Sequence, residues 1–262
     1  MLNKTEAKSE QKSVAPALTR GLKALELLAT TNQPQSLTAI SKHLGIAMSS
    51  AHSICSTLRN EGYIEKRSDG SFQLTLKVLD LASSKINKYD IVEHFYEACD
   101  EMPMIRENAS VIAVLDGQDV FYIGTRNSPH PLGVTFRVGM RLPACCTASG
   151  RALLANMTDE EVCRVYPDEL IPQVTKASLR TRSELLDVLA RVRKEGHAEE
   201  IATTRPHMCS YGALVATPSG KSIAGVAVSL YEGDVTPAVE RAAVSAISEL
   251  AKRLSRFGEM LT

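Results

Sequence analysis

The pattern of apolar residues over the first 60 positions predicts three helices. Apolar side chains recur every three or four positions, the spacing that places them on one face of a helix. In chain order they are Leu18, Leu22, Leu25 and Leu28; Leu37, Ile40 and Leu44; and Ala51, Ile54, Cys55 and Leu58. We expect the helices to begin at Pro16, after a cap at Ser36 or Thr38, and near Ser49, where the serine can also cap. Gly45 ends the second helix.

Two short strand-like runs follow the third helix. Residues 63–66 and 71–74 flank Asp69-Gly70, and an Asp-Gly pair is a strong signal for a hairpin turn because glycine tolerates positive φ. Three helices followed by a small hairpin are the layout of a winged helix-turn-helix.

The spacing changes in the second half of the chain, where strands and helices are mixed. Strand-like runs are predicted at 111–115, 120–123, 134–138, 213–217 and 222–230. Helices are predicted over 149–157, after capping boxes at 158–161 and 181–184, and from Pro237. The close spacing of several strands favours hairpin connections. The sequence therefore predicts an α+β domain with an antiparallel sheet.

Composition limits the class of protein. The chain has 262 residues, 44% of them apolar, which suffices for buried cores and for two domains. No run of about 18 apolar residues occurs, so no membrane span is expected. The first residues lack the apolar core of a signal peptide, and we expect a cytoplasmic protein.

The net charge of zero conceals an asymmetry between the two parts of the chain. Residues 1–88 hold 12 basic and 7 acidic residues, whereas residues 89–262 hold 18 basic and 23 acidic residues. A basic module is what attraction to a phosphate backbone requires. Two solvated surfaces with a chance imbalance are the alternative.

Six cysteines show no C-x-x-C pair and no histidine at zinc-finger spacing, so we expect no metal site and no cofactor. Cys145 and Cys146 are adjacent, which raises the possibility of a redox sensor. Adjacent cysteines rarely close a relaxed disulfide, and burial as small apolar residues is the favoured interpretation. Cys209 is a candidate for ligand contact.

At this point the chain resembles the IclR-type (isocitrate-lyase-regulator) family of bacterial transcription factors. The resemblance extends from about Ala17 to Phe257, and the order and spacing of its stretches are more specific than any one of them. These stretches are residues 20–28, 37–46, 49–50, 58–64, 138–143 and 147–155. The chain departs from the pattern at Ser53, where relatives often carry arginine, so the operator sequence cannot be transferred.

The resemblance implies a domain order and a function. The polar composition of residues 1–15 predicts a disordered arm, and the pattern over 76–90 predicts a linker helix. The resemblance implies a winged helix-turn-helix over 16–75 and a GAF-like domain over 91–262 that binds effector and assembles the oligomer. Such a protein is a regulator, more often a repressor, and not an enzyme. It binds double-stranded operator DNA and a small organic acid or aromatic metabolite, as a homodimer or homotetramer.

The polar face of the third helix and the hairpin turn are the candidate DNA contacts. Short polar side chains let a helix approach the groove closely, and basic residues beside the turn can contact phosphate. The candidates are Ser49, Ser50, His52, Ser53, Ser56 and Arg59 on the helix, and Lys66 and Arg67 beside the turn. An ordinary solvated face and a solvated turn are the alternatives.

The candidate effector site follows from matching the resemblance position by position. Backbone N–H groups at a helix start can bind a carboxylate, helped by the helix dipole. The matched positions are Val134, Leu142, Ala148, Ser149, Glu200, Met208, Ser210 and Ser229. Glu200 would repel a carboxylate and suits a hydroxyl or amine better. Simple core packing of Met208 and a solvent-facing Ser229 are the alternatives.

The sequence also leaves open a function from a different class. It is a small-molecule enzyme or thiol redox sensor with an accessory basic domain. No catalytic Cys–His spacing supports the enzyme. Salt-dependent binding to promoter DNA separates the two functions.

Overall fold

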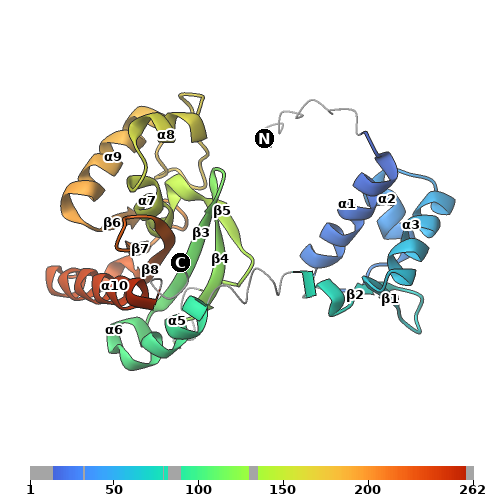
Figure 1. Ribbon diagram of the computed structural model, residues 1–262, viewed down its shortest axis with the longest axis horizontal. Coiled ribbons are helices and arrows are strands. Elements are labelled where there is room, and N and C mark those ends of the chain that lie inside the picture. Colours follow the sequence, from blue (N-terminus) through green and yellow to red (C-terminus); the bar gives the residue numbers. More distant parts are fainter. Residues whose placement is uncertain (1–13, 32, 79, 82–89, 130–134, 258–262) are drawn as a thin grey trace. The chain divides into compact units, whose positions relative to one another are not determined.

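The computed structural model describes residues 14–31, 33–78, 80–81, 90–129 and 135–257 (Figure 1). Contacts between Cα atoms divide the chain into two compact units, residues 1–87 and 88–262. Most of the predicted arm and of the predicted linker helix lies outside the described residues. No helix in the described ranges is long and apolar enough to cross a membrane.

The first unit is a winged helix-turn-helix, as predicted. Its helices are α1 (Pro16–Thr30), α2 (Leu37–Leu44) and α3 (Met48–Asn60). Its hairpin pairs β1 (Ile64–Lys66) with β2 (Phe72–Leu74) in antiparallel register. The cap of α2 is Ser36, which accepts a hydrogen bond from the Ala39 amide, and Gly45 ends the helix in the left-handed conformation.

The core of this unit uses a narrower face of α1 than the leucine pattern suggests. The buried apolar residues are Ala24, Leu28, Ile40, Ala51, Cys55, Ile64 and Phe72. Leu18 and Leu22 are 64% and 52% exposed, because Gly21 and Ala24 are the buried residues on this part of α1. The chain therefore keeps two large apolar side chains at the surface of this unit.

The second unit contains a six-stranded antiparallel sheet in the order β5-β4-β3-β8-β7-β6. Its strands are β3 (Ala109–Asp116), β4 (Asp119–Arg126), β5 (Arg141–Pro143), β6 (Ala198–Ile201), β7 (Met208–Ala216) and β8 (Ser222–Tyr231). Its helices are α5 (Asp90–Glu101), α6 (Pro103–Arg106), α7 (Ala148–Ala155), α8 (Asp159–Val165), α9 (Arg182–Glu195) and α10 (Pro237–Phe257). The predicted α+β class is confirmed.

Helices cover both faces of this sheet (Figure 1). One apolar core lies between the sheet and α5, α6 and α10, and a second lies between the sheet and α7, α8 and α9. Alternation along the strands decides which core a side chain enters. In β8, Val226 and Val228 enter the first core and Ala227 enters the second. Polar residues that share the α7 side with Ala227 are therefore candidates for a buried site.

Two sequence predictions need correction here. The strand predicted at 134–138 is not formed: Thr135–Arg137 has no regular structure, and residues 130–134 lie outside the described part. The sheet takes the shorter β5 instead. Phe136 is buried against the ring of Tyr122 although the backbone around it forms no strand. The short strand β6 was not predicted.

Glycines in β7 and β8 let α7 lie directly on the sheet. A Cβ atom at Gly225 would collide with the Ser149 carbonyl oxygen, and one at Gly212 would collide with the Ala148 backbone. Only glycine permits so close an approach of a helix to a strand. This contact fixes the first turn of α7 above the face of the sheet that carries Ser210 and Ser229.

We expect Gly225→Ala to destabilise the second unit by about 1–3 kcal/mol, because backbone atoms of α7 must move to admit the methyl group. Chemical denaturation followed by circular dichroism measures the loss. Gly233→Ala is the matched control, since its Cβ would meet only the exposed ring of Tyr231. Equal stability of the Gly225 variant and the native chain would contradict the close contact.

Candidate functional site

The outer face of α3 carries the predicted polar residues in one group. Ser49, Ser50, His52, Ser53 and Arg59 are exposed, and Ser56 is half-buried. The opposite face is anchored in the core by buried Ala51 and Cys55. Helical spacing therefore presents a row of short polar side chains ending in a cation.

The first turn of α3 lacks the predicted serine cap. The helix begins one residue before Ser49, its cap position is Ala47, and no side chain bonds to the first amides. Ser53 donates instead to the Ser49 carbonyl, 3.1 Å away. Uncapped amides at a helix start attract anions through the helix dipole. This end of α3 is thus suited to a phosphate oxygen.

The turn of the hairpin is rigidly built. Asp69 accepts a hydrogen bond from the Ser71 amide at 2.9 Å, and Gly70 adopts a φ of 83°. Lys66 and Arg67 are exposed beside this turn. The Arg67 guanidinium donates to Gln73 Oε1 at 3.3 Å, which leaves most of its donors facing solvent.

A small internal cavity in the second unit lies where α7 begins above β3, β7 and β8. The free space between its walls is about 10 Å³, roughly the room of one water molecule. The lining residues are Val111, Tyr122, Phe136, Thr147, Ala148, Ser149, Glu200, Thr204, Met208, Ser210, Ala227 and Ser229. The cavity is therefore lined by apolar and polar residues from one face of the sheet, from the start of α7 and from two loops.

The serines of this cavity offer free hydrogen-bonding capacity. Ser210 and Ser229 lie opposite each other in the sheet, with their hydroxyl oxygens 2.9 Å apart. Ser149 Oγ is fully buried and has no hydrogen-bond partner among the described residues. An unpaired buried hydroxyl costs about 1–3 kcal/mol, so this atom favours a ligand or water that bonds to it.

Glu200 is the charged residue of the cavity, and it is 1% exposed. Its Oε1 accepts hydrogen bonds from the amides of Thr203 (2.6 Å) and Thr204 (2.9 Å) and from the Thr203 hydroxyl (2.8 Å). These bonds compensate part of the cost of burying the carboxylate. They also tie the loop after β6 to the cavity wall.

The aromatic side of the cavity is formed by Tyr122 and Phe136, whose rings meet edge to face at 5.4 Å. Burial raises the pKa of the Tyr122 phenol, and the nearby Glu200 carboxylate adds to the rise. Tyr122 therefore remains a neutral hydrogen-bond donor.

Six of the eight predicted effector residues gather around this cavity: Ala148, Ser149, Glu200, Met208, Ser210 and Ser229. Leu142 does not line it and contributes to the surrounding apolar core. Val134 lies outside the described residues. Sequence reasoning missed the other six lining residues, whose place beside the cavity depends on the fold: Val111, Tyr122, Phe136, Thr147, Thr204 and Ala227.

The cysteines form no exposed reactive centre in the described part of the chain. Cys145 and Cys146 are fully buried, and their sulfur atoms are 3.9 Å apart. Burial raises the pKa of the Cys209 thiol to about 11, so the thiol stays protonated and weakly nucleophilic. Within the described ranges, no group of three or more metal-binding side chains is found.

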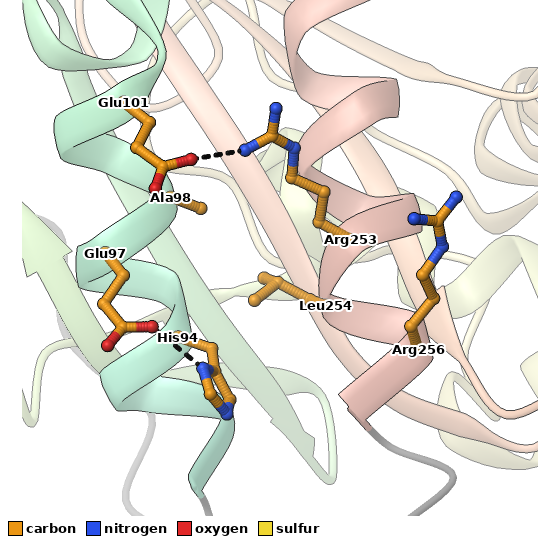
Figure 2. A pocket seen from close by; sticks show the side chains of 7 residues that line it. All are labelled: His94, Glu97, Ala98, Glu101, Arg253, Leu254 and Arg256. Atoms are coloured by element: carbon orange, nitrogen blue, oxygen red, sulfur yellow. Dashed lines mark hydrogen bonds and ion pairs between the residues drawn. The ribbon is translucent and has the colours of Figure 1, made fainter.

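A second hollow lies between α5 and α10, and Figure 2 shows its charged lining. The Arg253 guanidinium pairs with Glu101 at 2.8 Å, and His94 contacts Glu97 at 3.0 Å. None of the predicted site residues lines it. Four of its five charged or titratable side chains, His94, Glu97, Glu101 and Arg253, already have partners within the fold, which gives it less capacity for a ligand.

Comparisons with known proteins agree across both units. Residues 17–68 match the family described as the IclR helix-turn-helix domain, and residues 83–256 match the bacterial transcriptional regulator IclR C-terminal family. The regulator XynR of Escherichia coli is 26% identical over 186 residues, which are 71% of this chain and 74% of XynR. The transcriptional repressor IclR of the same organism is 24% identical, over 70% of this chain and 68% of its own length.

A solved structure shares the fold over nearly the whole chain. An IclR homologue from Microbacterium hydrocarbonoxydans, crystallised with 4-hydroxybenzoate, has a TM-score of 0.78 and 20% sequence identity. The alignment covers 92% of this chain and 98% of the other. At this identity the likeness shows the fold alone.

Proposed function

The chain belongs to the IclR family of bacterial transcriptional regulators, and from this premise we propose that it represses transcription until a small metabolite enters the cavity at the start of α7. DNA binding is the activity of the family, and the ligand, the sign of regulation and the site residues are the proposal. A regulator of chromosomal DNA works in the bacterial cytoplasm, without enzymatic turnover.

The observation that carries this proposal is the Ser149 hydroxyl, which has no hydrogen-bond partner among the described residues and lies in a cavity lined by other polar side chains. Ser149, Ser210 and Ser229 converge there with the Glu200 carboxylate. Convergent polar groups in an otherwise apolar cavity are typical of a small-molecule site.

The cavity selects a small ligand with two different ends. A carboxylate fits the first turn of α7, where the dipole and the Ser149 hydroxyl favour negative charge. A hydroxyl or amine fits the side of Glu200. The free space in the cavity, about 10 Å³, is far below the range of about 300–1,000 Å³ for drug-sized ligands, so side chains of the lining must move apart to admit a ligand. A hydroxy acid or a hydroxylated aromatic acid carries these two ends, and 4-hydroxybenzoate belongs to that class.

Operator binding is assigned to the exposed face of α3 and the hairpin turn. In this proposal the serines and His52 approach base edges in the major groove, while Lys66 and Arg67 contact phosphate. Serine discriminates weakly between bases, so two copies of the unit are needed for a specific operator.

A homodimer, with the homotetramer as a further assembly, supplies these two copies. Leu18 and Leu22 form an exposed apolar stripe on α1, and an exposed stripe of this kind is suited to pairing with a second copy. Light scattering of the intact protein tests this state: a monomer at micromolar concentration would contradict it.

Ligand and operator are linked by a population shift. Ligand that binds one arrangement of the second unit better than another changes the fraction of molecules competent for operator binding. The free-energy difference between the two arrangements changes by as much as the ligand's binding free energies to them differ. If the ligand changes operator affinity by some factor, operator must change ligand affinity by the same factor.

Binding to its own promoter tests the proposal against an enzyme or a thiol sensor. We expect a salt-dependent, sequence-preferring complex whose affinity is changed by an acid that also raises the melting temperature. Equal affinity for promoter and unrelated DNA would overturn the regulator interpretation.

A further inference from the structure

The proposed effector cavity is nearly full, although its polar residues converge as they do in a ligand site. The free space between its walls is about 10 Å³, whereas a cavity that binds benzene in another protein measures about 150 Å³. The buried Ser149 hydroxyl in its wall has no hydrogen-bond partner among the described residues. A ligand therefore reaches this hydroxyl only if a side chain of the lining leaves its place.

Most of the large side chains in the lining are anchored in the sheet. Val111, Tyr122 and Met208 belong to β3, β4 and β7, whose backbones pair with neighbouring strands. Glu200 belongs to β6, and its carboxylate accepts hydrogen bonds from two amides and a hydroxyl of the following loop. A movement of their backbone away from the cavity would break the sheet.

Phe136 is the exception among these large side chains. Residues 135–140, to which it belongs, form no helix or strand. Phe136 is 5% exposed, but the described residues beside it are exposed: Thr135, Arg137, Val138 and Gly139. One ring thus reaches from a surface segment into the cavity.

The Phe136 ring is held by packing and not by the sheet. It meets the Tyr122 ring edge to face, with the ring centroids 5.4 Å apart. The Phe136 amide donates to Asn127 Oδ1 at 2.7 Å, and this bond fixes the backbone and not the ring. Departure of the ring from the cavity therefore costs burial and one ring contact, while every strand pairing stays intact.

The ring of an aromatic ligand can replace each of these contacts. It buries apolar surface in the space that Phe136 leaves, and it can meet the Tyr122 ring edge to face in the same way. A carboxylate on that ring gives the Ser149 hydroxyl a partner at the start of α7, and a ring hydroxyl can donate to Glu200. An acyclic hydroxy acid offers the same polar ends but leaves the place of the ring partly empty.

We propose that the Phe136 side chain is a plug, which fills the effector cavity in the absence of ligand and gives way to the ring of a hydroxylated aromatic acid. The inference rests on the proposed effector site, and it adds the class of ligand and the side chain that moves. Ligand binds only those molecules whose plug has left, so their fraction lowers the apparent affinity.

The sign of the effect of substituting Phe136 tests the plug. In calorimetric titration of the full chain with 4-hydroxybenzoate, Phe136→Ala should raise affinity about tenfold or more, because the space is then open in every molecule. Phe136→Leu disturbs the fold less and should give a smaller rise. A wall that the ligand packs against would give the opposite sign. Weaker binding in both variants, or no binding to native chain and variants up to about 10 mM, would overturn the proposal.

The matched control is Leu189→Ala, which also removes a large side chain from the core on the α7 side of the sheet. Leu189 is fully buried there and does not line the cavity. Its variant should bind 4-hydroxybenzoate with native affinity. An equal rise in affinity would assign the effect to a loosened core and contradict the plug.

An acyclic acid tests the class of ligand. The probe is 6-hydroxyhexanoate, which carries a carboxylate and a hydroxyl without a ring. We expect it to bind the native chain at least about tenfold more weakly than 4-hydroxybenzoate. Equal or tighter binding of the acyclic acid would overturn the aromatic class.

Fluorine NMR observes the plug directly. The chain has five phenylalanines, and after labelling with 4-fluorophenylalanine the signal missing from Phe136→Leu belongs to Phe136. At saturating 4-hydroxybenzoate this signal should gain the difference between H2O and D2O that marks an exposed ring. A signal that stays protected from solvent at saturation would refute the plug and leave the proposed regulation intact. A displaced Phe136 with unchanged operator affinity would support the plug and refute that regulation.

Discussion

The Ser229→Leu variant should bind operator DNA with native affinity and show no response to effector. Ser229 is 5% exposed, lines the cavity and pairs with Ser210 at 2.9 Å. Leucine replaces the hydroxyl by an isopropyl group, which occupies the space that the ligand needs and leaves Ser210 without its partner. The measurement is fluorescence anisotropy of labelled operator, titrated with effector.

Overpacking of a core costs about 1–3 kcal/mol, so the thermal stability of this variant must be measured beside its response. Ser222→Leu is the matched control, because Ser222 stands at the exposed start of the same strand. It should respond to effector like the native chain. If effector changes the operator affinity of the Ser229 variant as it does that of the native chain, neither this serine nor the cavity that it lines takes part in effector recognition.

The second large effect is expected from Lys66→Ala combined with Arg67→Ala. Both side chains are exposed beside the hairpin turn. If each contacts one phosphate, the slope of log affinity against log salt becomes shallower by about 1.8 for each wing, and affinity falls by about tenfold or more. Measuring operator affinity at several salt concentrations gives both quantities.

The charge-matched control is Arg20→Ala combined with Lys23→Ala, which removes two exposed cations from α1. This control should keep the native slope. Equal slopes for the wing variant and the native chain would exclude phosphate contact by the wing. A uniform loss of affinity across operator and unrelated DNA would support it, because phosphate contacts carry no sequence information.

The elements with strong local signals could be predicted from the sequence. Both capping boxes form, at Thr158 with Glu161 and at Thr181 with Glu184, because each pairs two side chains with nearby amides. Gly196 ends α9 in the left-handed conformation as expected. Such signals involve residues within one turn and do not depend on the rest of the fold.

Features that depend on contacts between residues far apart in the chain could not be predicted from the sequence. Phe136 sits in an alternating apolar and polar segment that predicts a strand, yet its ring packs on Tyr122 and residues 135–137 form no strand. Thr204 joins the cavity only because its amide bonds to Glu200. The buried Arg151 side chain is a further case, since its guanidinium depends on the Cys145 and Glu199 carbonyls lying beside it.

Reciprocal coupling between ligand and operator tests the central claim most directly. An acid that raises the melting temperature of the intact protein is titrated against the protein with and without operator, and operator is titrated with and without the acid. We predict that the two affinities change by the same factor, about fivefold or more. An acid that binds in the cavity at the start of α7 and leaves operator affinity unchanged would contradict the account.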